Sequence, residues 1–246
     1  GLVFPGYDKY IIPSFDPPPE WPRLVAHDPG LSDPNAFVCA AIDKENGVVH
    51  IYRDKQYEGM GVDKLVDRWN KEIVYDISPY SWYTQPLMDG KMFGRRDRTS
   101  MQTLDGMWAQ YGVFFKAAHI PIKDRIWRAT TYLQASKIRI HDCCENLLRE
   151  LKTYKWRPQK LGVIWKEEPV DKDNHSVDCF EWILMELPEN PAGLVLSAFS
   201  GDGTMIGGHK YTDQELYAMH VFSDDEERPE WTMEGDYQCG EHYQYS

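Results

Sequence analysis

Three aspartates lie where a chain could hold them rigidly enough to bind metal ions. Asp28 follows the apolar run that begins at Leu24, Asp76 follows the run that begins at Ile73, and Asp178 opens an apolar-periodic segment. Carboxylate oxygens are the ligands that Mg²⁺ and Mn²⁺ prefer. Two such ions, held about 4 Å apart, can activate a water molecule and stabilise a leaving 3′ oxygen. These residue types therefore indicate a two-metal site that cuts nucleic acid.

Each aspartate also has an ordinary structural explanation. An Asp after a strand commonly starts a turn, and Asp178 could complement the dipole at the start of a helix. The order of the three acids along the chain favours a shared metal site over three separate turns. Asp173 and His175, close in sequence to Asp178, stay open as further metal contacts.

The segment 91–98 is locally basic in a chain whose formal net charge is −12. That charge is the opposite of the usual footprint of a nucleic-acid binder, so DNA would have to be held by a local group of cations. The candidates are Lys91, Arg95, Arg96 and Arg98, whose side chains could contact phosphates. The alternative is that this segment is a solvated loop.

The apolar pattern of the first half of the chain predicts the elements that would carry the acids. Three strands, a helix and a fourth, fully apolar strand are expected at 24–28, 36–43, 48–56, 62–69 and 73–76. The turn 44–47 ends in Asn-Gly, which is typical of a hairpin. If the first and fourth strands are parallel neighbours, Asp28 and Asp76 lie at the same end of the sheet.

The second half of the chain alternates helices with short strands. Helices are expected at 101–111, 121–133, 145–154 and 175–187, and strands at 113–116 and 137–141. Together these elements predict an α/β fold (α+β mixed sheet) built on a central mixed sheet. We expect residues 1–23 to be an extended lead-in, 24–190 to be the folded nuclease domain and 191–246 to be an acidic, aromatic tail.

Length and composition describe a globular protein. The chain has 246 residues, of which 42% are hydrophobic, and no apolar run is as long as a membrane span. Its five cysteines include no CxxC pair, which indicates reduced thiols in a cytosolic protein. No phosphate-binding P-loop motif occurs, so an ATP site is not expected in this chain. The first residue is not Met, which is typical of a fragment of a longer protein.

Several short motifs occur in a specific order along the chain. They are Gly1 to Pro5 with Trp21, Asp28-Pro29-Gly30 with Asp33-Pro34, Val74-Tyr75-Asp76 with Ser78-Pro79, Glu150-Leu151 with Tyr154 and Trp156, and Asp173 to Asp178. In this order they resemble the C-terminal nuclease domain of the large terminase subunit of tailed bacteriophages. The likeness departs at Cys179 to Trp182, where that family often has Ala-Leu-Arg-Tyr.

The resemblance implies an RNase H-like fold with helices on both faces of the sheet, and cutting of concatemeric viral DNA in the host cytoplasm. By analogy Asp28, Asp76 and Asp178 are the metal ligands, the cofactors are two Mg²⁺ or Mn²⁺ ions, and the substrate is double-stranded DNA. The implied partners are a motor (ATPase) domain of the same polypeptide, the portal and the small terminase subunit. A non-catalytic packaging or docking module, and another RNase H-like nuclease such as a junction resolvase, are the alternatives.

Overall fold

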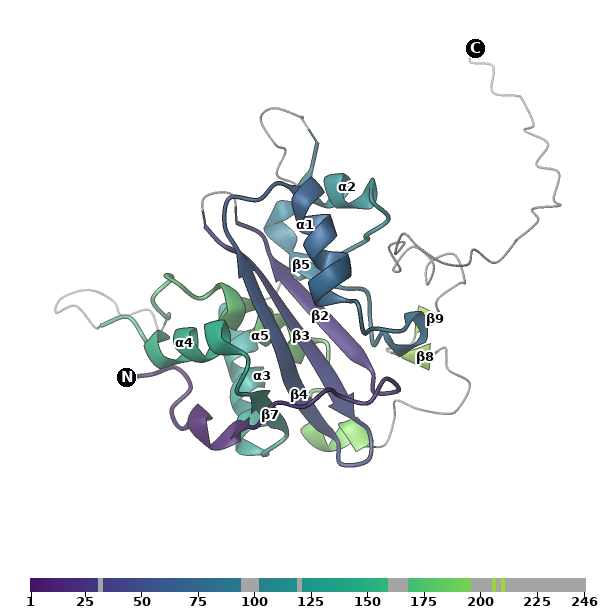
Figure 1. Cartoon of the computed structure of the whole chain (residues 1–246). Helices are drawn as coiled ribbons and strands as arrows, with labels where there is room; N and C mark the ends of the chain where they lie inside the picture. Colours follow the sequence, from purple (N-terminus) through teal and green to yellow (C-terminus); the bar gives the residue numbers. More distant parts are fainter. Residues whose placement is uncertain are drawn as a thin grey trace, which may run out of the picture.

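A seven-stranded mixed sheet forms the centre of the protein (Figure 1), in the order β1-β7-β4-β3-β2-β5-β6. The computed structural model describes residues 1–30, 33–93, 102–118, 121–158, 168–195, 205–206 and 209–210. The strands are β1 (Ile11–Ile12), β2 (Arg23–Asp28), β3 (Asn35–Asp43), β4 (Val48–Tyr57), β5 (Leu87–Asp89), β6 (Lys116–Ala118) and β7 (Ile138–His141). β3 pairs antiparallel with β2 and β4, and the other neighbours pair in parallel, so the mixed sheet is confirmed.

Helices cover both faces of this sheet, as the resemblance implies (Figure 1). One face carries α1 (Val62–Arg68) and α2 (Leu104–Ala109); the other carries α3 (Ile122–Gln134), α4 (Glu145–Thr153) and α5 (His175–Met185). The smaller elements are η1 (Tyr7–Tyr10), η2 (Trp69–Ile73), η3 (Pro79–Ser81), η4 (Gly90–Met92), η5 (Pro191–Val195), β8 (Met205–Ile206) and β9 (His209–Lys210). No helix in the described part of the chain is both long and apolar enough to cross a membrane.

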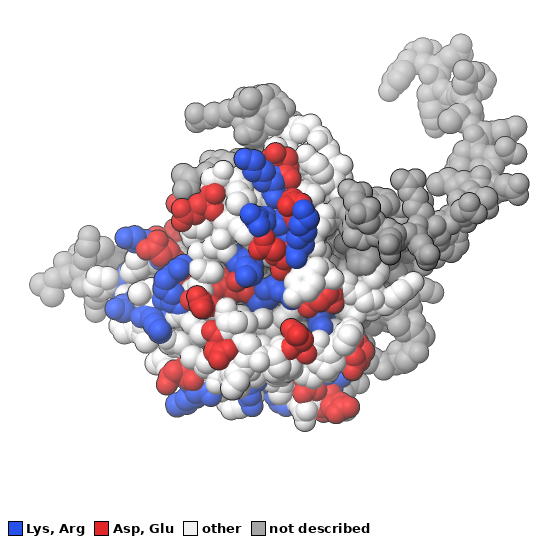
Figure 2. All heavy atoms as spheres, viewed as in Figure 1, with Lys and Arg blue, Asp and Glu red and all other residues white. Residues whose placement is uncertain are grey.

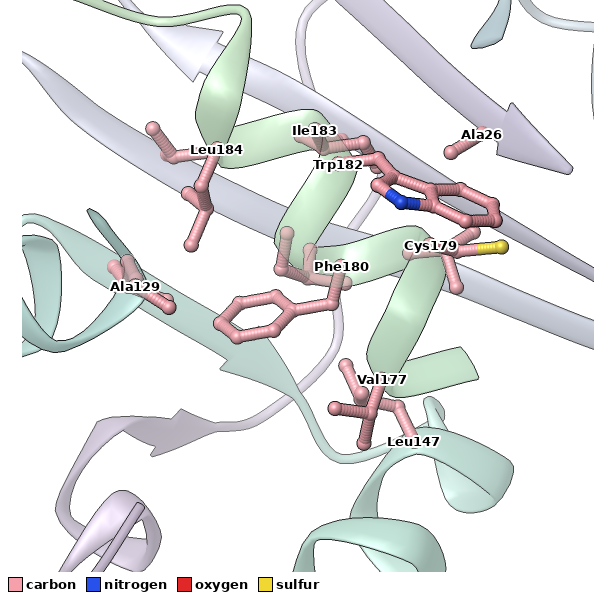
Figure 3. Close-up of a cluster of buried hydrophobic side chains, with 14 of the residues drawn as sticks. Ala26, Ala129, Leu147, Val177, Cys179, Phe180, Trp182, Ile183 and Leu184 are labelled. Carbon is pink, nitrogen blue, oxygen red and sulfur yellow. The ribbon is translucent and has the colours of Figure 1, made fainter. Parts of the chain in front are cut away.

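The core on the α5 side is built around α5 itself. Figure 3 shows Val177 beside Leu147 of α4, and Phe180 and Leu184 directed toward Ala129 of α3. The helix also packs on β2 and β3. Since α5 is held by two helices and the sheet at once, its first turn has a fixed place relative to the strand ends.

A one-residue bulge interrupts β4 at Tyr52. Its neighbours Ile51 and Arg53 pair with consecutive residues of β3, which leaves Tyr52 as the extra residue. Tyr52 and Arg53 therefore both face the α1 side of the sheet. Asp54 faces the α5 side, where it accepts a hydrogen bond from the N–H of Leu147.

The expected strand at 73–76 is wrong. α1 continues into the π-helical turn η2, and residues 74–76 form a bend and a turn. Ile73 and Val74 are buried in the core on the α1 side, so this apolar run packs the end of a helix against the sheet. A short apolar run does not by itself distinguish a strand from a buried helix segment. The parallel neighbour of β2 is instead β5, which lies in a stretch without an expected element.

The lead-in packs on the folded domain. Val3, Phe4 and Tyr7 belong to the core on the α5 side, and β1 pairs in parallel with β7 and forms one edge of the sheet. At the other end, Leu194 of η5 is buried in the same core. The described domain thus gains apolar contacts from both sides of the expected 24–190 range. The expected strand at 113–116 is shifted, since β6 begins at Lys116.

Candidate metal centre

Two acidic residues lie side by side at the carboxyl ends of the neighbouring parallel strands β2 and β5. His27 of β2 pairs with Met88 of β5, and the next residues along the two strands are Asp28 and Asp89. Burial raises the pKa of Asp28, and the nearby charge of Asp89 raises it further. The sheet therefore places two carboxylates close enough to repel each other.

The third acid comes from α5. Burial raises the pKa of Asp178 to about 6, and the charge of Asp28 adds to the rise, whereas Arg125 of α3 opposes it. Asp178 accordingly lies near Asp28, although the two are far apart in the chain. Asp28 thus lies at a strand end and Asp178 in the first turn of a helix, and their role as metal ligands stays a prediction.

Asp76 lies apart from this group. Its two carboxylate oxygens accept hydrogen bonds from the guanidinium of Arg53, at 2.6 Å and 3.0 Å. Arg53 also faces the α1 side of the sheet, away from α5. The prediction that Asp76 shares a sheet edge with Asp28 is wrong, because its supposed strand is the end of a helix.

Asp89 takes the place that Asp76 was expected to fill, and sequence reasoning missed it. The signal was present: Leu87 and Met88 precede the acid and Gly90 follows it, much as an apolar run precedes Asp28 and a Pro-Gly turn follows. The run before Asp89 is only two residues long, and Pro86 precedes it. A run of that length carries little strand signal.

Two basic side chains, an imidazole and a guanidinium, contact the acids. Nδ1 of His175 lies 2.7 Å from Oδ2 of Asp28, and this hydrogen bond raises the pKa of the imidazole. Arg125 lies between two carboxylates, 3.0 Å from Oδ1 of Asp178 and 3.5 Å from Oε2 of Glu181. Glu181 is fully buried, and burial raises its pKa to about 8. The acidic group is thus partly neutralised by the chain's own side chains.

The remaining expected site residues lie outside this group or outside the described residues. Asp173 is exposed, and its carboxylate lies 3.8 Å from Nζ of Lys172. Lys91 is exposed in η4, directly after the acidic edge, and its N–H donates to Oδ1 of Asp89 at 3.0 Å. Arg95, Arg96 and Arg98 lie outside the described residues.

Carboxylate oxygens suit a hard divalent cation, but in this structure the acids are not close enough together to bind one. Among the described residues, no three His, Cys, Asp or Glu side chains are grouped closely enough to hold a metal ion. The three acids Asp28, Asp89 and Asp178 nevertheless offer oxygen donors, and the charge of Asp89 raises the pKa of Asp28 as the charge of Asp28 raises that of Asp178. If the ion pair between Arg125 and Asp178 opened, the Asp178 carboxylate would become available to a metal ion. The residues present therefore fit the group that the resemblance implies.

The mixed seven-stranded sheet with helices on both faces is an RNase H-like α/β fold, and large terminases are among the solved structures that share it. The large terminase of a thermophilic bacteriophage, solved as a longer chain, matches with a TM-score of 0.61 and 21% identity over 75% of this chain. The nuclease domain of the P22 large terminase matches with a TM-score of 0.55 and 16% identity, covering 75% of this chain and 92% of that one.

A third structure in this comparison contains a metal. The large terminase nuclease from the thermophilic phage G20c, with bound magnesium, matches with a TM-score of 0.52 and 16% identity, covering 75% of this chain and 96% of that one. The present chain spans 44% of the length of the longer terminase named first. No family model and no curated protein matches the sequence. The likeness is therefore one of fold, shared with nuclease domains over most of their length.

Proposed function

We propose that this chain is a metal-dependent DNA endonuclease that cuts concatemeric viral DNA during genome packaging in the host cytoplasm. The observation that carries the proposal is that Asp28 and Asp89 end two neighbouring parallel strands of an RNase H-like sheet, and that Asp178, in the first turn of α5, lies near Asp28. A solved neighbour of the same fold, the G20c nuclease, holds magnesium. Asp89 replaces Asp76 as the second acid of the proposed site.

Each residue has a distinct part in this proposal. Asp28, Asp89 and Asp178 would hold two Mg²⁺ or Mn²⁺ ions, which when bound supply an activated water and stabilise the leaving oxygen. His175 orients the carboxylate of Asp28 through its 2.7 Å hydrogen bond. Arg125 neutralises Asp178 when no metal is bound, since its guanidinium lies 3.0 Å from the carboxylate.

The substrate of the proposed nuclease is double-stranded DNA, held by the basic segment 91–98. Lys91, the first residue of this segment, follows Asp89 by two residues and donates its N–H to the Asp89 carboxylate, so it lies beside the proposed metal site. On the face shown in Figure 2, acidic and basic side chains of the described residues alternate. A local group of cations is therefore the physical requirement for holding a polyanion. A motor domain of the same polypeptide, the portal and the small terminase subunit are the proposed partners.

The test uses four matched substitutions. Asp28→Asn, Asp89→Asn and Asp178→Asn should each lower Mn²⁺-dependent nicking of plasmid DNA by more than the roughly 10–100-fold that loss of an outer contact costs. Asp76→Asn changes the same chemistry outside the site and should leave nicking in place. If Asp76→Asn abolishes nicking while Asp89→Asn does not, the site is assigned to the wrong acid.

Two further results would redirect the proposal. Wild-type protein that binds no Mn²⁺ and cuts no DNA would indicate a docking module whose acids are structural. Preferential cutting of branched DNA or of an RNA–DNA hybrid over a linear duplex would indicate a different RNase H-like nuclease. Both are measured with the same wild-type preparation, on plasmid, four-way junction and hybrid substrates.

A further inference from the structure

We infer that Glu150 and Asp54 are positioning residues, which hold the start of α5 and thereby fix His175 and Asp178 against Asp28. This inference rests on the proposed nuclease function and adds two buried carboxylates that touch neither metal nor substrate. Both lie on the α5 side of the sheet, Asp54 on β4 and Glu150 on α4.

The first turn of α5 is capped from another helix. Its own N-cap residue, Asn174, makes no capping hydrogen bond, and its side-chain amide instead donates to Oδ2 of Asp178 at 3.1 Å. The N–H groups of Ser176 and Val177 donate to Oε2 of Glu150, at 2.7 Å and 3.0 Å. An uncapped helix start leaves such donors without partners. Glu150 therefore supplies the cap that the local sequence lacks.

Asp54 makes the corresponding contacts for α4 and links it to α5. The N–H of Leu147 donates to Oδ2 of Asp54 at 2.6 Å, in the first turn of α4, whose N-cap residue also makes no capping bond. The hydroxyl of Ser176 donates to Oδ1 of Asp54 at 2.9 Å. A single carboxylate on the sheet thus holds the starts of both helices at a fixed separation.

Gln56 closes the network from the same strand. Its Nε2 donates to Oε1 of Glu150 at 2.5 Å and lies 3.0 Å from the hydroxyl of Ser176. The exposed fractions are 5% for Asp54, 2% for Glu150 and 0% for Ser176, so water cannot substitute for these contacts. The bulge in β4 is needed for this network. Without the extra residue at Tyr52, the side chains of Asp54 and Gln56 would point to the other face of the sheet.

The connection to the proposed site is one of backbone. Ser176 and Val177, the two residues whose N–H groups Glu150 accepts, lie between His175 and Asp178. If these two peptide groups were less firmly held, His175 and Asp178 would both shift relative to Asp28. Residues that orient metal ligands from outside typically change metal affinity or activity by about 10–100-fold when they are replaced.

Glu150→Gln is the decisive variant, since it keeps the shape and places an amide where Gln56 also presents an amide. We expect the Mn²⁺ dissociation constant to rise and kcat for plasmid nicking to fall by about 10–100-fold, with KM for DNA unchanged. Amide hydrogen exchange at positions 176 and 177 should become faster. Glu145→Gln, on the exposed side of the same helix, is the matched control and should leave all these quantities unchanged.

Three outcomes decide the inference. If Glu150→Gln keeps the Mn²⁺ affinity and kcat of the wild type, the positioning role is overturned. The proposed function still stands in that case, provided that the wild type cuts DNA. If the wild type neither binds Mn²⁺ nor cuts, the proposed function fails, and unchanged amide exchange in the variant would overturn the positioning role separately. Should Glu150→Gln fail to fold, Ser176→Ala removes the hydroxyl that contacts Asp54 and Gln56 and keeps the backbone bond to Glu150. A wild-type metal affinity in that variant would count against the network.

Discussion

At the scale of single residues, Asp178 is held between a cation and other acids. Arg125 lies 3.0 Å from Asp178 and 3.5 Å from Glu181, and only 9% of its side chain is exposed. A buried cation between two carboxylates neutralises them but also competes with any metal for the same oxygens. Arg125 is therefore expected to stabilise the metal-free protein and to weaken its response to metal.

Replacement of Arg125 by Met tests this balance. Removal of one partner of a buried ion pair costs about 3–5 kcal/mol, so the melting temperature without metal should fall. The rise in melting temperature on adding Mn²⁺ should be larger than in the wild type, because the ion then neutralises acids that have no other cation. Thermal denaturation with and without Mn²⁺ measures both effects. A rise equal to or smaller than that of the wild type would contradict the counter-ion role.

The sequence pointed to two of the three acids of the proposed site for a clear reason. Asp28 ends a fully buried strand of six residues, and Asp178 lies in the first turn of a largely buried helix of eleven residues, so both patterns extend over several residues. Asp89 follows a strand of three residues, whose pairing depends on β2 and β6 rather than on its own sequence. Asp76 follows an equally short apolar run that packs against the sheet as part of a helix end.

At the scale of elements, the pairing of β4 with β7 buries two histidines against the lead-in. Nδ1 of His50 lies 3.3 Å from Nε2 of His141, and the rings of Phe15 and Trp21 pack on His50. Burial lowers the pKa of His50 from 6.5 to about 4, and the charge of His141 lowers it further, whereas Asp43 opposes the shift. The pKa of His141 is also lowered, mainly by burial.

Stability should therefore depend on pH through His50. Between pH 6.5 and 4 the unfolded chain binds a proton at His50 that the folded chain does not, so acidification favours unfolding. The free energy of unfolding should fall across this window, and the fall should be smaller in His50→Gln. Urea unfolding at a series of pH values measures the difference between the two proteins. Parallel curves would show that His50 is not held neutral by the fold.

The same strand shows where pattern reasoning about elements fails. Strands 24–28, 36–43 and 48–56 were predictable because their apolar runs and the Asn-Gly turn agree with each other. The bulge at Tyr52 was not, since a single extra residue leaves composition unchanged and only shifts which face each later side chain occupies. The contacts of Asp54 with α4 and α5 depend on that shift.

At the scale of the whole molecule, the formal net charge of −12 limits how DNA can be held. Replacing Lys91, Arg95 and Arg96 by Ala should weaken DNA binding and nicking without changing Mn²⁺ affinity. Each lost phosphate contact should flatten the salt dependence of binding by about one unit. Fluorescence anisotropy at several salt concentrations measures this slope. An unchanged slope would rule out the segment as a DNA contact and direct attention to the basic residues between Arg149 and Lys160.

The contact between Asp28 and His175 joins positions 147 residues apart in the chain. β2, β3 and β4 pair through short connections, whereas α5 can dock on them only after a long loop has closed, which costs entropy before any contact repays it. We therefore expect the acidic site to form after the rate-limiting step of folding. Mn²⁺ should then slow unfolding and leave the refolding rate unchanged, because a ligand that binds only after the barrier acts on the unfolding rate alone. In stopped-flow experiments, faster refolding with Mn²⁺ would mean that α5 already lies on β2 at the barrier. Under the expected order, bound metal lengthens the lifetime of the folded domain without helping it to fold.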